Sequence, residues 1–133
     1  MMTEKAGNLL QEIARSKRYP VVRFELKSTK DRSLRSTALN HVRIQKADEG
    51  IEEIKERGAA LKELEEEGMV VIDYALPVTL SADYAVYEES KAFQLLKQAV
   101  EEGKSRPGFL FDQAVMRRGM VQLTSRGKKS IGL

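Results

Sequence analysis

The chain has 133 residues and a net charge of +3, with 41% hydrophobic and 32% charged residues, which fits one soluble globular domain. It contains no Cys, which excludes disulfides and thiol chemistry, and a single His, His41, which excludes metal sites that need two His from one chain. No apolar run approaches the ~18 residues of a membrane helix, and the N-terminal segment lacks the apolar core of a secretion signal. We therefore expect a cytoplasmic protein without membrane contact.

A helix and a strand are expected near the N-terminus. Apolar residues recur at helical spacing over residues 3–16. Over residues 20–27, PVVRFELK, apolar and charged residues alternate, which is typical of a strand with one buried face. One face of this strand carries Val22, Phe24 and Leu26, and the other carries Arg23, Glu25 and Lys27. Residues 36–46 fit either a strand or a short helix, and the pattern leaves both open.

The clearest helix is predicted over residues 48–67. Asp48 is a suitable N-cap, and Glu residues in the first turn complement the positive end of the helix. Its apolar stripe consists of Ile51, Ile54, Leu61 and Leu64. Gly68 ends the helix. Gly58 either lies within it, at a cost of about 1 kcal/mol relative to Ala, or forms a turn between two shorter helices.

The C-terminal half predicts a mixture of strands and helices. The expected elements are strands at 69–76 and 84–89 joined by a loop, helices at 91–102 and 107–119, a strand at 120–124 and a final basic turn. Two charges followed by Gly-Met-Val occur at 66–70 and again at 117–121, which we interpret as a helix ending at glycine before a strand. The predicted fold class is α+β: one domain over 1–133, a small antiparallel sheet with hairpins, and about four helices.

Charge is distributed unevenly along the chain. Residues 15–46 hold ten Lys or Arg and two acidic residues, a net +8, and residues 103–133 hold seven and one, a net +6. Between them, residues 48–67 hold three and nine, a net −6, and residues 73–102 hold two and six, a net −4. Two basic blocks flanking an acidic middle indicate either a polyanionic partner or pairing between the blocks.

About half of the chain resembles winged helix-turn-helix regulators of the MarR and PadR type. The resemblance rests on LKELEEEGMVVIDYA, on YAVYEE after it, and on the tail Leu123-Thr124-Ser125-Arg126-Gly127. It implies that residues 51–58 and 59–68 are paired helices, that a β-hairpin wing follows, and that the protein is a variant winged helix acting in transcription regulation. The second of these helices is rich in Glu, which opposes approach to phosphate, so the basic segments are the expected contact.

The leading functional prediction is a non-enzymatic nucleic-acid-binding module. Basic segments 15–46 and 117–129 would contact the phosphate backbone of DNA or RNA. The candidate residues are Arg32, Arg35, Arg43, Lys46, Arg117, Arg118, Arg126, Lys128 and Lys129. Tyr19 lies among basic residues and is the candidate for stacking on bases. The four phenylalanines, Phe24, Phe93, Phe109 and Phe111, occur in apolar patterns and are expected in the core.

Two other functions remain open. The chain fits a protein-interaction or homo-oligomerisation domain, such as a homodimer, with an interface formed by Ile51, Ile54, Leu61, Leu64, Tyr74, Tyr84 and Tyr87. A third interpretation is a metal-dependent nuclease of the PD-(D/E)xK kind, with Asp73 at one strand end and Glu89-Ser90-Lys91 on the next strand. Phosphate-loop, dinucleotide and nucleophile-elbow motifs are absent from the sequence, so we predict neither an enzyme nor a cofactor or metal.

Overall fold

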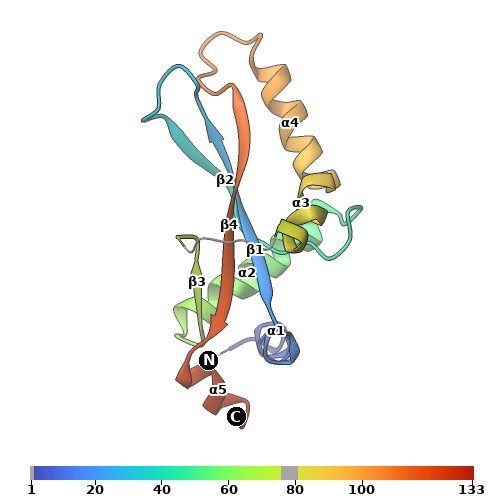
Figure 1. Cartoon of the computed structure of the whole chain (residues 1–133), viewed down its shortest axis with the longest axis vertical. Coiled ribbons are helices and arrows are strands. Elements are labelled where there is room, and N and C mark those ends of the chain that lie inside the picture. Colours follow the sequence, from blue (N-terminus) through green and yellow to red (C-terminus); the bar gives the residue numbers. More distant parts are fainter. Residues whose placement is uncertain (1, 76–80) are drawn as a thin grey trace.

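A computed structural model describes residues 2–75 and 81–133 (Figure 1). In chain order the elements are α1 (Glu4–Arg15), β1 (Tyr19–Lys27), β2 (Arg35–Val42), α2 (Ile51–Glu66), β3 (Val70–Asp73), η1 (Ser81–Tyr84), α3 (Ala85–Glu89), α4 (Lys91–Gly103), β4 (Gln113–Leu123) and α5 (Ser125–Ser130). The fold is α+β, as predicted. Within the described residues, no helix combines the length and the apolar composition that crossing a bilayer requires.

One curled antiparallel sheet forms the centre of the molecule, with strand order β2-β1-β4-β3. β1 pairs with β4 along its whole length, from Tyr19 opposite Val121 to Lys27 opposite Gln113. The pairing of β1 with β2 shifts register around Phe24, and such an irregularity bends a strand and increases its twist. The sheet twists along its length, so its upper part, where β2 pairs with β1, is turned relative to its lower part, where β3 pairs with β4, as Figure 1 shows.

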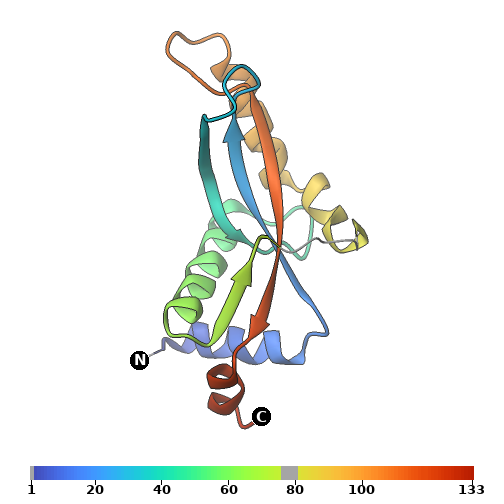
Figure 2. The same cartoon turned by 60° about the vertical axis from the view of Figure 1, so that its left-hand side comes forward.

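Helices cover the two faces of the sheet, one face near its lower end and the other near its upper end. Tyr19 and Val21 belong to a lower core with α1 and α2, whereas Val22 and Phe24 belong to a second core with α3 and α4. Alternate residues of a strand point to opposite faces, so β1 contributes to both cores. In Figure 2, α4 lies behind the upper strands, and α1 and α2 lie lower. The upper strands are thus packed against a helix on one face only.

Short polar contacts define where the helices begin. The hydroxyl oxygens of Thr3, Ser90 and Thr124 each accept a hydrogen bond from a backbone amide in the first turn of α1, α4 and α5. Such side-chain caps satisfy amides that have no partner inside a helix. The final basic turn, expected after Thr124, is therefore a capped helix.

Several predicted elements are corrected. Residues 35–42 form strand β2, which resolves the ambiguity over 36–46 in favour of a strand as far as Val42. α2 is one continuous helix, with Gly58 buried inside it. Gly58 allows β2 to approach, because a Cβ atom there would lie 3.3 Å from the carbonyl oxygens of Asn40 and His41.

Two further predictions of secondary structure are wrong. Residues 84–89 are helical rather than a strand, and this places Tyr84 and Tyr87 together in the upper core. Residues 113–119, expected in a helix, are part of β4. Gly119 consequently lies within a strand and ends no helix. In both segments, burial against the sheet overrides a local pattern that fits two structures.

The elements implied by the winged-helix resemblance are only partly present. The two paired helices, 51–58 and 59–68, are a single helix. β3 pairs with β4, Val70 lying opposite Leu123, and not with residues 84–89. The Leu-Thr-x-x-Gly tail does follow a strand that pairs with β3, although that strand comes much later in the chain than the expected wing.

Candidate nucleic-acid interface

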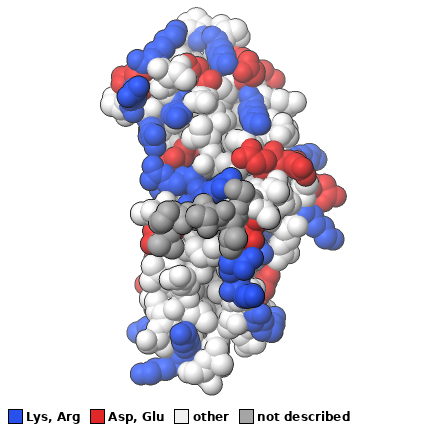
Figure 3. Space-filling view, viewed as in Figure 1, with Lys and Arg blue, Asp and Glu red and all other residues white. Residues whose placement is uncertain are grey.

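A charged surface lies on the upper half of the sheet, on the face opposite α4. Arg23 on β1 lies opposite Arg117 on β4, and Lys27 lies opposite Arg35 on β2. Cross-strand partners share a face, so three strands place these cations together. We call this surface the basic face; it consists of Arg23, Lys27, Arg35 and Arg117 around Glu25. Figure 3 shows Lys and Arg side chains gathered at mid-height on the left-hand side of the molecule, with further basic side chains above them.

Glu25 sits at the centre of the basic face and is 8% exposed. Its Oε1 lies 3.7 Å from Arg117 Nε and 3.9 Å from Arg35 Nη1. Both distances exceed that of a hydrogen bond, and the two arginine side chains are 44% and 48% exposed. Such ion pairs contribute little to stability. Four cations and one carboxylate leave a net +3 on this surface, available to an external anion.

Arg23 is held in position from two sides. Its Nε donates a hydrogen bond of 2.9 Å to Asn40 Oδ1, and its guanidinium carbon lies 4.3 Å from the centre of the Tyr74 ring. The Tyr74 ring lies against Gly119, where a Cβ atom would be 2.6 Å from the ring carbon Cδ1. Glycine at 119 therefore makes room for the ring that supports Arg23. A cation fixed in this way loses little side-chain entropy when it binds an anion.

A hydrogen-bond network links this support to α2. His41 Nδ1 lies 2.8 Å from Tyr74 Oη, and His41 Nε2 lies 3.4 Å from Glu65 Oε1. His41 has a φ of 51°, a left-handed conformation that is uncommon outside glycine. Burial lowers the pKa of His41, although Glu65 acts in the opposite direction. Burial also raises the pKa of Tyr74 to about 12, so Tyr74 is uncharged at neutral pH.

The basic face contains two of the nine predicted nucleic-acid contacts, Arg35 and Arg117. Arg118 follows Arg117 in the chain but lies on the opposite face, over the Tyr84 ring at 5.1 Å. Arg43 stacks over Tyr19 at 4.4 Å and donates to the Pro20 carbonyl. The other five lie elsewhere: Arg32 in the β1–β2 loop, Lys46 before α2, and Arg126, Lys128 and Lys129 on α5 at the lower end of the molecule (Figure 1).

Arg23 and Lys27 were absent from the predicted set. The signal that could have found them was the alternation in PVVRFELK, which placed Arg23, Glu25 and Lys27 on the face away from the apolar core. The spacing within β1 identifies this face of the strand but not the residues that neighbouring strands add to it. Arg35 and Arg117 lie on the same face only because of the strand register.

Most of the predicted interface is buried inside the chain. The buried members are Ile54, Leu61, Leu64, Tyr84 and Tyr87, each at most 1% exposed. Ile51 is 36% exposed and Tyr74 is partly buried. The prediction that the five buried residues form a partner surface is therefore wrong, because they fill the cores that hold the helices on the sheet.

The aromatic residues also differ from expectation. Tyr19, predicted to stack on bases, is 2% exposed and belongs to the lower core. Phe24 and Phe93 are buried as predicted, with ring centroids 5.2 Å apart. Phe109, expected in the core, is 37% exposed. Phe111 is partly buried.

The geometry expected of the nuclease is not formed. Asp73 ends β3, but Glu89 ends α3 and Lys91 begins α4, so the Glu-Ser-Lys segment does not lie on a strand. In the part of the chain that the structure describes, no group of three or more His, Asp or Glu side chains could hold a metal ion.

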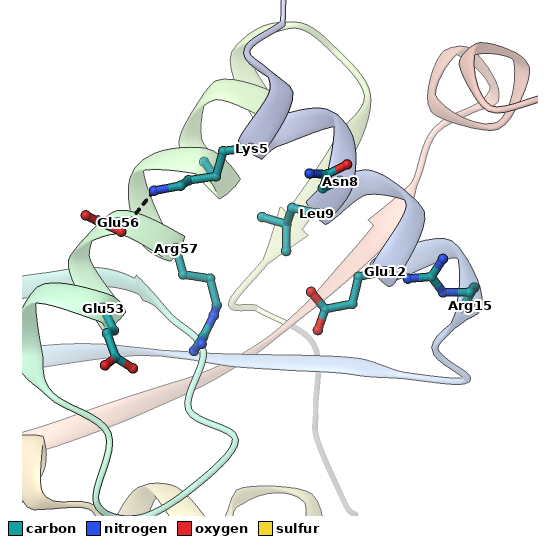
Figure 4. Close-up of a pocket in the computed structure, with 9 residues that line it drawn as sticks. Lys5, Asn8, Leu9, Glu12, Arg15, Glu53, Glu56 and Arg57 are labelled. Carbon is teal, nitrogen blue, oxygen red and sulfur yellow. Dashed lines mark hydrogen bonds and ion pairs between the residues drawn. The ribbon is translucent and has the colours of Figure 1, made fainter.

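A hollow of about 490 Å³ lies between α1 and α2 and is the second candidate site (Figure 4). Its charges largely have partners within the chain. Lys5 Nζ lies 2.9 Å from Glu56 Oε2, Glu12 accepts a hydrogen bond from Gln45, and Arg57 pairs with Glu49 at 2.8 Å. This hollow therefore offers an external ligand less uncompensated charge than the basic face does.

Comparison with known proteins assigns no family. No protein-family model matches the sequence, and no curated protein matches it. A solved structure of an uncharacterized protein from the hydrocarbon-degrading marine bacterium Alcanivorax borkumensis SK2 is similar in shape, with a TM-score of 0.49 and 19% sequence identity. The match covers 96% of this chain and 82% of that one. A likeness of this degree carries no argument about function.

Proposed function

We propose that the protein is a non-enzymatic nucleic-acid-binding module that holds a phosphate backbone on the basic face. The observation that supports this most directly is the grouping of Arg23, Lys27, Arg35 and Arg117 around one carboxylate, on the face of the sheet opposite α4. Arginine forks match phosphate oxygens in geometry. A backbone bound in this way is positioned without being read for sequence.

In this proposal the nucleic acid lies on the basic face and does not contact the acidic surface of α2, whose Glu65 lies near the residues that support Arg23. Glu52, Glu53, Glu56, Glu65 and Glu66 are exposed on this helix, and carboxylates repel phosphate. The helix therefore does not enter a groove, and a role as a small transcriptional regulator would depend on backbone contacts through the sheet. This proposal narrows the basic segments 15–46 and 117–129 to the strand residues that share one face.

The proposal is tested by fluorescence anisotropy of labelled DNA and RNA, in duplex and single-stranded form, at several salt concentrations. The logarithm of the association constant should fall linearly with the logarithm of salt concentration, by about 0.7 to 0.9 per phosphate neutralised. Arg117→Ala with Arg35→Ala should lower both the affinity and this slope.

A matched control distinguishes binding at the basic face from attraction by the net charge of the protein. Lys128→Ala with Lys129→Ala removes the same charge from α5, at the other end of the molecule. We expect this pair to change affinity much less than the arginine pair. Equal losses from both pairs would show that net charge alone attracts the nucleic acid, and no binding at low salt would refute the proposed function.

A further inference from the structure

A groove of about 780 Å³ lies at the upper end of the molecule, beside the basic face. Residues of the β1–β2 loop and of the segment joining α4 to β4 line it, and both loops lie at the top in Figures 1 and 2. Its walls combine the aromatic and apolar side chains Phe109, Leu110 and Phe111 with two cations, Lys30 and Lys104, and two carboxylates, Asp31 and Asp112. Because Lys104 pairs with Glu101 at 2.8 Å, the positive charge that would attract a phosphate backbone comes from the basic face and not from the groove.

Phe109 forms a fixed platform in this groove. Its ring lies against Gly103 at the end of α4, where a Cβ atom would be 2.7 Å from the ring carbon Cε1. The Phe111 ring meets it nearly edge-on, with centroids 6.1 Å apart and an interplanar angle of 78°. Although anchored in this way, Phe109 remains 37% exposed. An aromatic ring that is both held and accessible is suited to stacking on a flat ligand.

The groove continues the basic face. Gln113 lines the groove and is also the cross-strand partner of Lys27, which itself lies opposite Arg35. The Asp112 amide donates a hydrogen bond of 3.1 Å to the Lys27 carbonyl, which fixes the segment after Phe111 to the end of β1. A strand of phosphates lying across Arg23 and Arg117 would therefore reach the aromatic groove by passing Lys27 and turning around the end of the sheet toward Phe109, which packs against the end of α4.

We infer that the preferred ligand is single-stranded nucleic acid, with one base stacked on Phe109 and its neighbouring phosphates on the basic face. The inference rests on the proposed function and names its ligand class. Single-strand binding combines a positive track for the backbone with aromatic rings on which bases stack. The bases of a duplex are stacked on one another, so their faces cannot reach Phe109.

The test compares two ligands of equal charge: a labelled oligothymidylate and an abasic deoxyribose-phosphate oligomer of the same length. The wild-type protein should bind the oligothymidylate about 5- to 150-fold more tightly, which is the range for stacking of one base. Phe109→Ala should remove most of this difference while leaving affinity for the abasic oligomer unchanged. Phe109→Tyr keeps an aromatic ring and should preserve the difference.

Leu110→Ala is the matched control in the same loop, because Leu110 is 61% exposed but not aromatic. It should leave the preference for bases intact, and thermal melting should show that each variant is folded. Equal wild-type affinity for both oligomers would overturn the inference and leave the proposed function standing. Loss of affinity for both oligomers in Phe109→Ala would also overturn it.

Two other results are informative. If neither oligomer binds at low salt, the proposed function fails, and the inference fails with it. If light scattering instead shows a dimer that Leu110→Ala dissociates, with no preference for bases, the groove binds a second copy of the chain and the inference is wrong.

Discussion

Arg117 on β4 lies across from Arg23 on β1, yet it pairs with the carboxylate of Glu25, with Arg117 Nε 3.7 Å from Glu25 Oε1. The same oxygen lies 3.9 Å from Arg35 Nη1. Glu25 thus holds two arginines from two different strands near one point while satisfying neither at hydrogen-bond distance. It limits the repulsion within the basic face and also competes with any bound anion.

Glu25→Gln should consequently have opposite effects on stability and binding. Removing the carboxylate leaves the cations unbalanced, and we expect the free energy of unfolding to fall by about 0.5–1 kcal/mol, since the partners are half exposed. Nucleic-acid affinity at low salt should rise roughly fivefold, corresponding to the loss of one repulsive charge at close range in water. Urea denaturation and anisotropy measure the two effects.

Glu66→Gln is the control for that experiment, because it makes the same change of charge on the exposed surface of α2, where Glu66 lies 3.9 Å from Lys62. It should change neither quantity appreciably. A fall in both stability and affinity for Glu25→Gln would mean that Glu25 orders the arginines rather than competing with the ligand.

Gly127 in the Leu-Thr-x-x-Gly tail is required by packing. A Cβ atom there would overlap the backbone carbonyl of Met69, at the start of the segment that leads into β3. Thr124 Oγ1 accepts from the Gly127 amide and donates to the Gly68 carbonyl at 2.6 Å. The tail therefore fastens α5 to the end of α2.

Gly127→Ala should lower the free energy of unfolding by about 1–3 kcal/mol, the usual cost of forcing extra volume into a packed site. Gly7→Ala is the comparison, because Gly7 is also helical but has open space around its Cα. It should raise the free energy of unfolding by about 0.5–1 kcal/mol through better helix propensity. Similar urea midpoints for the two variants would contradict the packing argument.

The sequence predicted the fold best where the pattern of apolar residues fitted only one type of secondary structure. The alternation at 20–27 corresponds to β1, and the helical spacing at 3–16 corresponds to α1. α1 packs one apolar face, whereas β1 is buried on both faces at its start and so differs from the single buried face that the alternation predicts. The helix predicted over residues 113–119 is wrong because their sequence suits either a helix or a strand, and only pairing with β1 decides between the two. The strand predicted over residues 84–89 is wrong for the same reason, because Tyr84 and Tyr87 have helical spacing but are aromatic residues of a kind common in strands.

The candidate site was less predictable than the fold. Net charge per segment located the basic blocks but could not separate Arg117 from Arg118, which face opposite sides of β4. Aromatic residues were assigned by their neighbours in sequence, so Tyr19 appeared accessible and Phe109 appeared buried. Burial depends on which helix covers which half of the sheet, and strand register sets that arrangement.

The buried His41 predicts how stability depends on pH. Burial lowers its pKa in the folded protein below the ordinary value of 6.5, while Glu65 opposes the shift and Arg23 and Lys62 add to it. As the pH falls below about 6.5, the unfolded chain takes up a proton before the folded one does. The contribution of His41 to stability is therefore complete above pH 6.5 and decreases through the range just below it.

His41→Asn should remove this dependence, because Asn tolerates the left-handed backbone at this position but does not titrate. Urea midpoints of both proteins at several pH values between about 5 and 8 give the comparison. The variant should be less stable throughout, since it loses the contacts to Tyr74 and Glu65, but its midpoint should fall less steeply with acidification. Parallel curves would mean that His41 has the same pKa in the folded and unfolded chains, and that the hydrogen bond to Tyr74 and the pairing with Glu65 offset its burial.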